Sequence, residues 1–130
     1  LYYYNEGVNF VADHILYAIG NIYANGLGSV TPNFKKALYY YNELAEMDPS
    51  WGNGAIGDLF FINEIFKEQA DSELAYQHYL IGANNGSSYC AYRLALMNYY
   101  GVGTIPNKTK ANEYKKIAID GGFSVSDFNF

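Results

Sequence analysis

Cysteine is almost missing from this sequence, since Cys90 is the only one among 130 residues. A single cysteine excludes an internal disulfide and any zinc site built from cysteines. The two histidines, His14 and His78, lack neighbours at the spacing that a zinc site or a catalytic triad requires. We therefore expect no metal, no cofactor and no catalytic residue, and the protein is predicted not to be an enzyme.

Basic residues are also scarce. Lys and Arg together number 8 against 13 Asp and Glu, and no basic run is longer than a pair. Because a surface that binds nucleic acid has to be basic, this balance argues against nucleic acid as a partner. The formal net charge of −5 favours a neutral or basic partner instead.

Long apolar runs and an initiator methionine are missing as well. No stretch is long enough to cross a bilayer, so we expect no membrane span. The first residues already follow a helical pattern, which predicts that the sequence is a piece of a longer protein.

Tyrosine, by contrast, is abundant. There are 15 tyrosines, and hydrophobic residues make up 50% of the sequence, enough for a substantial core. A tyrosine side chain combines a large apolar ring with a hydroxyl group, so it suits both the seams between helices and binding surfaces.

The sequence repeats itself at intervals of 36 to 38 residues. Residues 1–6 are identical to residues 38–43, Gly20 recurs as Gly57, and the Gly-Leu-Gly of residues 26–28 recurs as Gly-Val-Gly at residues 101–103. Similarity at a fixed period of this length is typical of solenoids built from helix pairs. The glycine loops could also be read as phosphate-binding loops, but each follows a helical pattern rather than a strand.

We expect one all-α domain, an α/α superhelix of antiparallel helix pairs. Its three units span residues 12–48, 49–86 and 87–122. Residues 1–11 are predicted to end a preceding unit. Residues 123–130 are predicted either to cap the last unit or to begin a further one.

Each unit should contain two helices. The first helix carries an apolar stripe, which in the first unit is Leu16, Ile19, Gly20 and Tyr23. Gly20 inside a helix predicts that a neighbouring backbone comes close. In the second unit we expect the first helix to extend through Phe66.

The second helix of each unit should begin at a capping residue of the same kind. In the first unit this helix is expected from about Phe34 to Met47 and to end at Asp48-Pro49. A small polar residue stands four residues before an alanine in every unit, and such residues accept hydrogen bonds from the first turn of a helix. The expected N-caps are Asn33, Asp71 and Asn107.

The combined pattern resembles the Sel1-like repeat family, which is related to tetratricopeptide repeats. The residues that carry the resemblance are Ile19, Gly20, Tyr23, Gly26, Gly28, Lys36, Ala37, Tyr40, Tyr41 and Ala45, with Leu94, Gly101, Val102, Gly103, Lys110, Ala111, Tyr114 and Gly122 in the third unit. The second unit lacks Gly-x-Gly, and Ala95 and Asn98 replace the usual Gly and Tyr. The resemblance implies a superhelix that scaffolds protein complexes.

In solenoids of this kind the first helices line the concave face. The positions that point away from the apolar stripe are then expected to contact a protein or peptide partner, unless neighbouring units bury them. The predicted partner-binding residues are His14, Tyr17, Asn21, Trp51, Asp58, Phe61, Tyr89, Tyr92, Leu96 and Tyr99.

Two other functions remain open at this point. Cys-rich relatives suggest a hydrolase that acts on cell-wall or lactam substrates, although no nucleophile here is paired with a base. The chain could also be a structural spacer between other domains. Cys90 could be an activated thiol near a helix start, but a small buried core residue is the more common role of such a cysteine.

Overall fold

The computed structural model describes residues 2–61 and 63–130, and it describes side chains from Val11 onward. Within these residues all regular structure is helical, as the sequence predicts. The six α-helices are α1 (Tyr2–Asn25), α2 (Phe34–Met47), α3 (Pro49–Phe60), α4 (Ser72–Asn84), α5 (Ser88–Tyr100) and α6 (Lys108–Asp120), and two short 3-10 helices, η1 (Lys67–Gln69) and η2 (Val125–Asp127), lie outside them.

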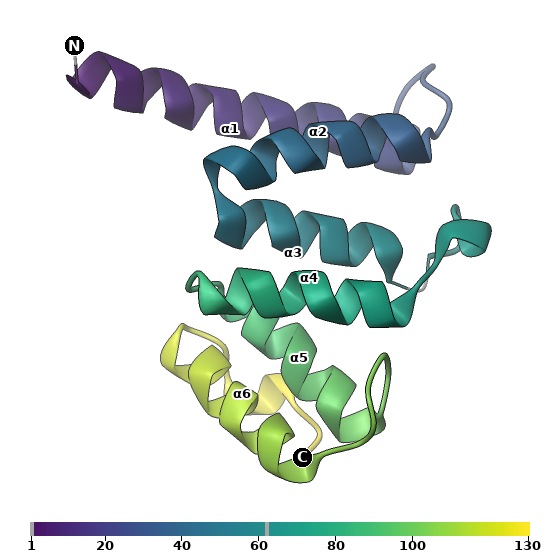
Figure 1. Ribbon diagram of the computed structural model, residues 1–130, viewed down its shortest axis with the longest axis vertical. Coiled ribbons are helices and arrows are strands. Elements are labelled where there is room, and N and C mark those ends of the chain that lie inside the picture. Colours follow the sequence, from purple (N-terminus) through teal and green to yellow (C-terminus); the bar gives the residue numbers. More distant parts are fainter. Residues whose placement is uncertain (1, 62) are drawn as a thin grey trace.

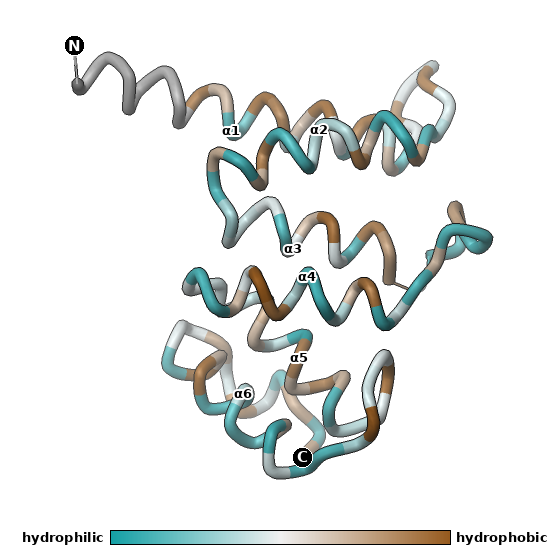
Figure 2. Tube along the Cα trace, in the orientation of Figure 1, coloured by the Kyte–Doolittle hydropathy of each residue, from teal (hydrophilic) through white to brown (hydrophobic). Residues whose placement is uncertain are grey.

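The helices stack in chain order (Figure 1). Within each pair α1 packs on α2, α3 on α4 and α5 on α6, and between pairs α2 packs on α3 and α4 on α5. Hydrophobic and hydrophilic residues alternate along the helices (Figure 2), as amphipathic helices require when they are covered on one side. None of the described helices combines the length and the apolar character needed to cross a membrane.

The three predicted N-caps are confirmed. The side chains of Asn33, Asp71 and Asn107 each accept a hydrogen bond of 3.0 Å from the backbone N–H three residues later. The backbone N–H of each cap also donates to a carbonyl of the preceding helix: Asn33 to Tyr23 at 2.8 Å, Asp71 to Phe60 at 2.7 Å and Asn107 to Asn98 at 2.7 Å. Each second helix is therefore tied at its first residue to the helix with which it pairs.

The expected end of α2 is also confirmed. Asp48 closes α2 and caps α3 with its side chain, and Pro49 occupies the first turn of α3, where its missing N–H is not needed. Gly26 and Gly101 adopt φ values of +66° and +73°, which end α1 and α5.

The structure shows no break where residues 1–11 were expected to end a preceding unit, because α1 runs from Tyr2 to Asn25. The repeat places Val11 and Ala12 at the positions of Asp48 and Pro49. Val11-Ala12 supplies neither a capping side chain nor a proline, so nothing interrupts the helix. Leu1 and the side chains of residues 2–10 lie outside the described part of the chain.

The prediction that the first helix of the second unit reaches Phe66 is wrong, because α3 ends at Phe60. The side chain of Asn63 accepts hydrogen bonds from the backbone of Ile65 at 2.7 Å and of Phe66 at 3.3 Å, which forms a turn. The turn places Phe66 in the core, with its ring edge-on to Phe34 at 5.4 Å. The chain therefore leaves the helix after Phe60, and Phe66 is buried against the first unit instead of continuing α3.

The core follows the repeat. Alanines occupy the tightest positions of the second helices, and Ala37, Ala75 and Ala111 are all 0% exposed. Gly20 was expected to lie against a neighbouring backbone, but it lies against a side chain. A Cβ at this position would collide with the ring of Tyr41. Gly57 faces the ring of Tyr79 in the same way.

Residues 123–130 pack against the third unit. The ring of Phe123 stacks on Tyr92 at 4.7 Å, and the ring of Phe130 stacks on Tyr99 at 4.1 Å. Phe128 is buried between them, and Lys115 of α6 donates to the backbone carbonyl of Phe130. The tail thus covers a part of α5 that was expected to face a groove.

Candidate binding groove

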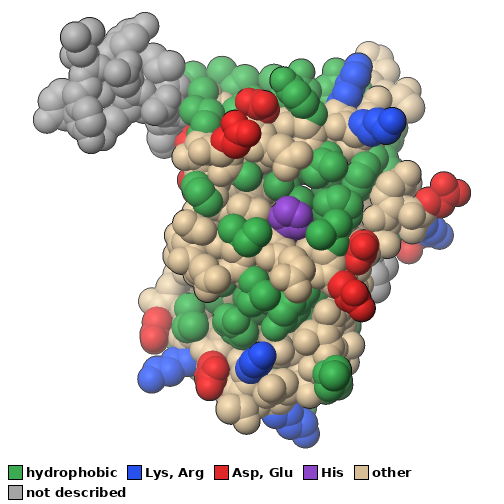
Figure 3. Space-filling model, viewed as in Figure 1, with side chains coloured by type: hydrophobic (Ala, Val, Ile, Leu, Met, Phe, Trp, Pro, Cys, Tyr) green, Lys and Arg blue, Asp and Glu red, His purple; other side chains and the backbone are tan. Residues whose placement is uncertain are grey.

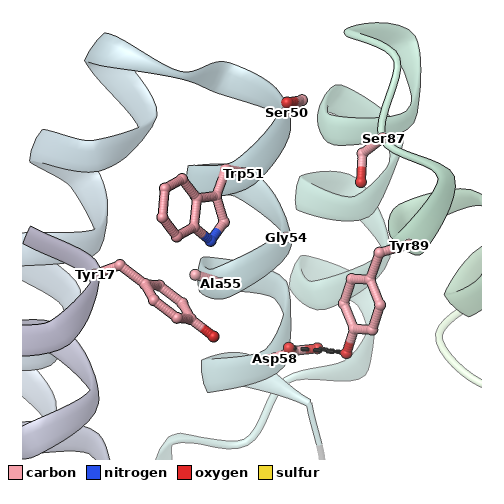
Figure 4. A pocket seen from close by; sticks show the side chains of 8 residues that line it. All are labelled: Tyr17, Ser50, Trp51, Gly54, Ala55, Asp58, Ser87 and Tyr89. Carbon is pink, nitrogen blue, oxygen red and sulfur yellow. Dashed lines mark hydrogen bonds between the residues drawn. The ribbon is translucent and has the colours of Figure 1, made fainter. Parts of the chain in front are cut away.

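The first helices of the three units enclose a pocket of about 360 Å³. Tyr17 comes from α1, Trp51 and Asp58 come from α3, and Tyr89 comes from α5, so every unit contributes a large side chain (Figure 4). Ser50, Gly54, Ala55 and Ser87 complete the lining. The glycine and the alanine leave the room that the aromatic rings surround.

A second hollow of about 190 Å³ continues from the first toward the C-terminal end of α1. The two hollows share Tyr17, Ala55 and Asp58, and the second adds Asn21 and Asn63. Together they form one groove with Asp58 at its middle. We refer to the lining of these two hollows as the groove.

One wall of the groove is aromatic. The ring of Trp51 lies 4.9 Å from Tyr17 and 5.0 Å from His14, and the His14 ring meets it edge-on. Tyr17 also contacts Tyr41 at 6.2 Å. These contacts hold Trp51 and Tyr17 in place although both are only half-buried.

Asp58 is the polar centre of the groove. Its carboxylate accepts hydrogen bonds from the hydroxyl of Tyr79 at 2.5 Å and from the hydroxyl of Tyr89 at 2.8 Å. The Nε of Arg93 lies 3.6 Å from the same carboxylate and donates to the Tyr89 hydroxyl at 2.9 Å. Three residues from α4 and α5 therefore orient one carboxylate of α3.

Burial raises the pKa of Asp58, while the hydrogen bonds from Tyr79 and Tyr89 and the charge of Arg93 lower it, and the net shift is upward. The pKa values of Tyr79 and Tyr89 are raised by burial and then by the neighbouring carboxylate, so both hydroxyls keep their protons and donate. Burial lowers the pKa of Arg93, but Tyr79, Tyr89 and Asp58 outweigh it and the pKa is raised. The guanidinium group therefore stays charged.

The hydrogen bond from the Tyr79 hydroxyl to the Asp58 carboxylate has a counterpart in the first unit, where the acceptor is an uncharged amide. There, the hydroxyl of Tyr41 donates to the side chain of Asn21 at 2.5 Å. The repeat places Asn21 and Tyr41 at the positions of Asp58 and Tyr79. The carboxylate is thus a particular feature of the middle unit.

The structure brings half of the ten predicted binding residues into the groove: Tyr17, Asn21, Trp51, Asp58 and Tyr89. His14 is exposed and packs against Trp51. Phe61 and Leu96 line a separate hollow of about 150 Å³ next to Arg93. Tyr92 and Tyr99 stack on tail residues, so the concave row of the third unit is largely covered.

Arg93 is the main residue that the sequence analysis missed. It is the only arginine of the chain and stands one helical turn after Tyr89. The four-residue spacing places its side chain on the same face of α5 as Tyr89, a predicted groove residue. Ser50 and Ser87 were also missed, and no sequence signal distinguishes them from other serines.

Cys90 and His78 lie between helices. Cys90 is 0% exposed, and a Cβ added at Gly82 would collide with its Sγ and one added at Gly54 would lie 3.3 Å from it, so the thiol fills space that these glycines leave. Burial is the largest effect on its thiol and raises the pKa to about 11. His78 stacks on Phe60 at 6.0 Å, and its Nδ1 lies 2.9 Å from the side-chain oxygen of Asn53. Cys90 therefore packs in the core, as expected, whereas His78 is half-buried between α3 and α4.

The arrangement described so far can bind a ligand through aromatic rings and one carboxylate. Across the described part of the chain, His, Cys, Asp and Glu do not gather into a group of three that could hold a metal ion.

An all-α stack of antiparallel helix pairs with a groove along its first helices defines a solenoid repeat protein. The Sel1 repeat family matches residues 16–49, 65–87 and 88–123, which is more than half of the sequence. The chain belongs to this family. Sel1 repeats generally serve as scaffolds for protein–protein interactions.

Two solved structures resemble the fold. One is a Sel1 repeat protein from Oxalobacter formigenes, with 26% identity and a TM-score of 0.73 over 88% of this chain and 45% of that one. The other is a protective antigen present in uropathogenic Escherichia coli strains, with 22% identity and a TM-score of 0.72 over 88% of this chain and 24% of that one. The chain thus spans less than half of either structure. No curated protein matches the sequence.

Proposed function

We propose that this chain is a non-enzymatic adaptor that holds a segment of a partner protein in the groove. The observation that carries the proposal is the pocket between Tyr17, Trp51 and Tyr89, which every unit helps to form. Half-buried aromatic side chains around a hollow are typical anchors of protein interfaces. A rigid stack lets these anchors act together without reorganisation of the groove.

Affinity purification from the organism that makes the protein tests this function. Trp51→Ala removes the largest ring of the pocket and should lower the amount of captured partner about tenfold or more, the usual effect of losing a central aromatic anchor. Tyr39→Ala is the matched control, because Tyr39 is an aromatic residue of α2 that is 59% exposed and does not line the groove.

Circular dichroism should show that both variants keep their helical content. The proposal is contradicted if Trp51→Ala captures the same proteins in the same amounts as the unchanged chain. A purely structural spacer would give that result, since its function does not depend on the groove.

A further inference from the structure

The groove helices contain few positive charges. Helices α1 and α3 have no lysine or arginine, and α5 has Arg93 alone. The seven lysines lie in α2, α6 and η1. Figure 3 shows one face of the molecule, on which the Lys and Arg side chains, both in blue, lie mostly toward the edges. The groove therefore offers a carboxylate with little competing positive charge around it.

The carboxylate of Asp58 has room for another donor. Its side chain is 43% exposed, and it lines both hollows of the groove. Two tyrosine hydroxyls donate to it, whereas an ionised carboxylate has about four acceptor sites. Arg93 Nε lies 3.6 Å away, which is an ion-pair distance but too long for a hydrogen bond.

The chain itself shows how this carboxylate and its neighbouring rings bind a cation. The guanidinium carbon of Arg93 lies 5.4 Å from the ring centre of Tyr89 and 5.4 Å from that of Phe61, beside Asp58. The faces of aromatic rings attract cations at this distance. Tyr17, Trp51 and Tyr89 line the pocket together with the same carboxylate (Figure 4).

We propose that the pocket binds one lysine or arginine side chain of the partner segment, with its cationic group against Asp58 and its aliphatic part along Trp51. The volume of about 360 Å³ lies at the lower end of the range of small-ligand pockets, about 300–1,000 Å³, which suits a single long side chain. Ser50 and Ser87 also line the pocket. The Ser50 hydroxyl donates to Asp48 and the Ser87 hydroxyl accepts from the backbone N–H of Cys90, and each oxygen keeps a lone pair that can accept from the peptide backbone. This inference rests on the proposed function and names the chemistry of its anchor.

Trp51 is the only tryptophan of the chain, so its fluorescence reports on the pocket directly. The probe is Nα-acetyl-lysine methylamide, titrated at low ionic strength, and the control is Nα-acetyl-norleucine methylamide, which has a similar stem without the charge. The lysine probe should change the Trp51 signal with saturation at a concentration on the order of 1–10 mM, as expected for one anchor without its peptide. The norleucine probe should bind at least about fivefold more weakly.

Two variants should change the affinity for the lysine probe in opposite directions. Asp58→Asn should weaken binding of the lysine probe by about tenfold and remove its preference over norleucine, because the charge is lost. Arg93→Gln should strengthen binding several-fold, because it removes the internal cation that shares the carboxylate. A general disturbance of the groove would weaken binding in both variants, so the opposite signs identify the role of the charge. Asp120→Asn is the matched control, since it removes an exposed carboxylate at the end of α6 and should change nothing.

The proposal is overturned if the two probes bind equally, if no saturation is seen below about 50 mM, or if Arg93→Gln weakens binding as Asp58→Asn does. This failure is distinct from failure of the proposed function. If the probes do not discriminate but Trp51→Ala still abolishes partner capture, the groove binds a partner through an anchor that is not cationic.

Discussion

The glycines inside the helices set how closely two helices pair. The ring of Tyr41 occupies the space where Gly20 has no side chain, and Tyr79 does the same at Gly57. In the third unit the repeat places Ala95 and Lys115 at these positions. A lysine brings no ring like those of Tyr41 and Tyr79, and Ala95 packs instead with Ala91, Ala118 and the ring of Phe128 from the tail.

Gly57→Ala should destabilise the protein. The added methyl group would collide with the ring of Tyr79, which is 0% exposed and cannot turn away. Overpacking of this kind lowers the free energy of unfolding by about 1–3 kcal/mol, despite the higher helix propensity of alanine. Urea denaturation followed by circular dichroism measures the change.

Gly54→Ala in the same helix is the control for this substitution. A Cβ there would lie 3.3 Å from the Sγ of Cys90 and 3.6 Å from Tyr89, so only a small adjustment is needed. Its effect on the free energy of unfolding should be clearly smaller. Equal losses in the two variants would show that Tyr79 does not determine the need for glycine at position 57.

At the scale of helices, the sequence determines the starts of the second helices well and the end of α3 poorly. Asn33, Asp71 and Asn107 act through the first turn of their own helices, so a local pattern is enough to find them. Phe66 depends on contact with Phe34, which is far away in the sequence. The uninterrupted α1 has the opposite cause: residues 1–6 repeat residues 38–43, but the Asp48-Pro49 pair that ends α2 is not repeated at Val11-Ala12.

Asn107→Ala should weaken the start of α6. The variant removes the acceptor for the backbone N–H of Lys110 and should lower the free energy of unfolding by about 1 kcal/mol. Asn107→Asp retains the acceptor and should be close to neutral. Asn112→Ala, at an exposed position within the same helix, controls for the loss of an asparagine. A loss as large for Asn112→Ala as for Asn107→Ala would contradict the assigned cap.

For the whole molecule, the repeat predicts which face forms the groove but not how much of it is open. The spacing of the units brings Tyr17, Trp51 and Tyr89 together, since Trp51 and Tyr89 occupy the same position of their first helices and Tyr17 lies about one turn further along its own. The same reasoning fails for Tyr92 and Tyr99, because the rings of Phe123 and Phe130 in the tail stack on them. Arg93 was missed because its role depends on a carboxylate of the neighbouring unit.

The tail should stabilise the last unit as a cap. Phe128 is 6% exposed and packs with Ala91, Ala95 and Ala118, so Phe128→Ala should lower the free energy of unfolding by about 3 kcal/mol. Val125→Ala is the control in the same segment, because Val125 is 65% exposed, and it should be nearly neutral. In a solenoid each unit contacts only its neighbours, so the loss should be greatest in α5 and α6. Hydrogen exchange should therefore show faster exchange in these two helices and little change in α2. Equal acceleration in all helices would indicate that the stack unfolds as one unit, and an unchanged stability would show that the tail is not a cap.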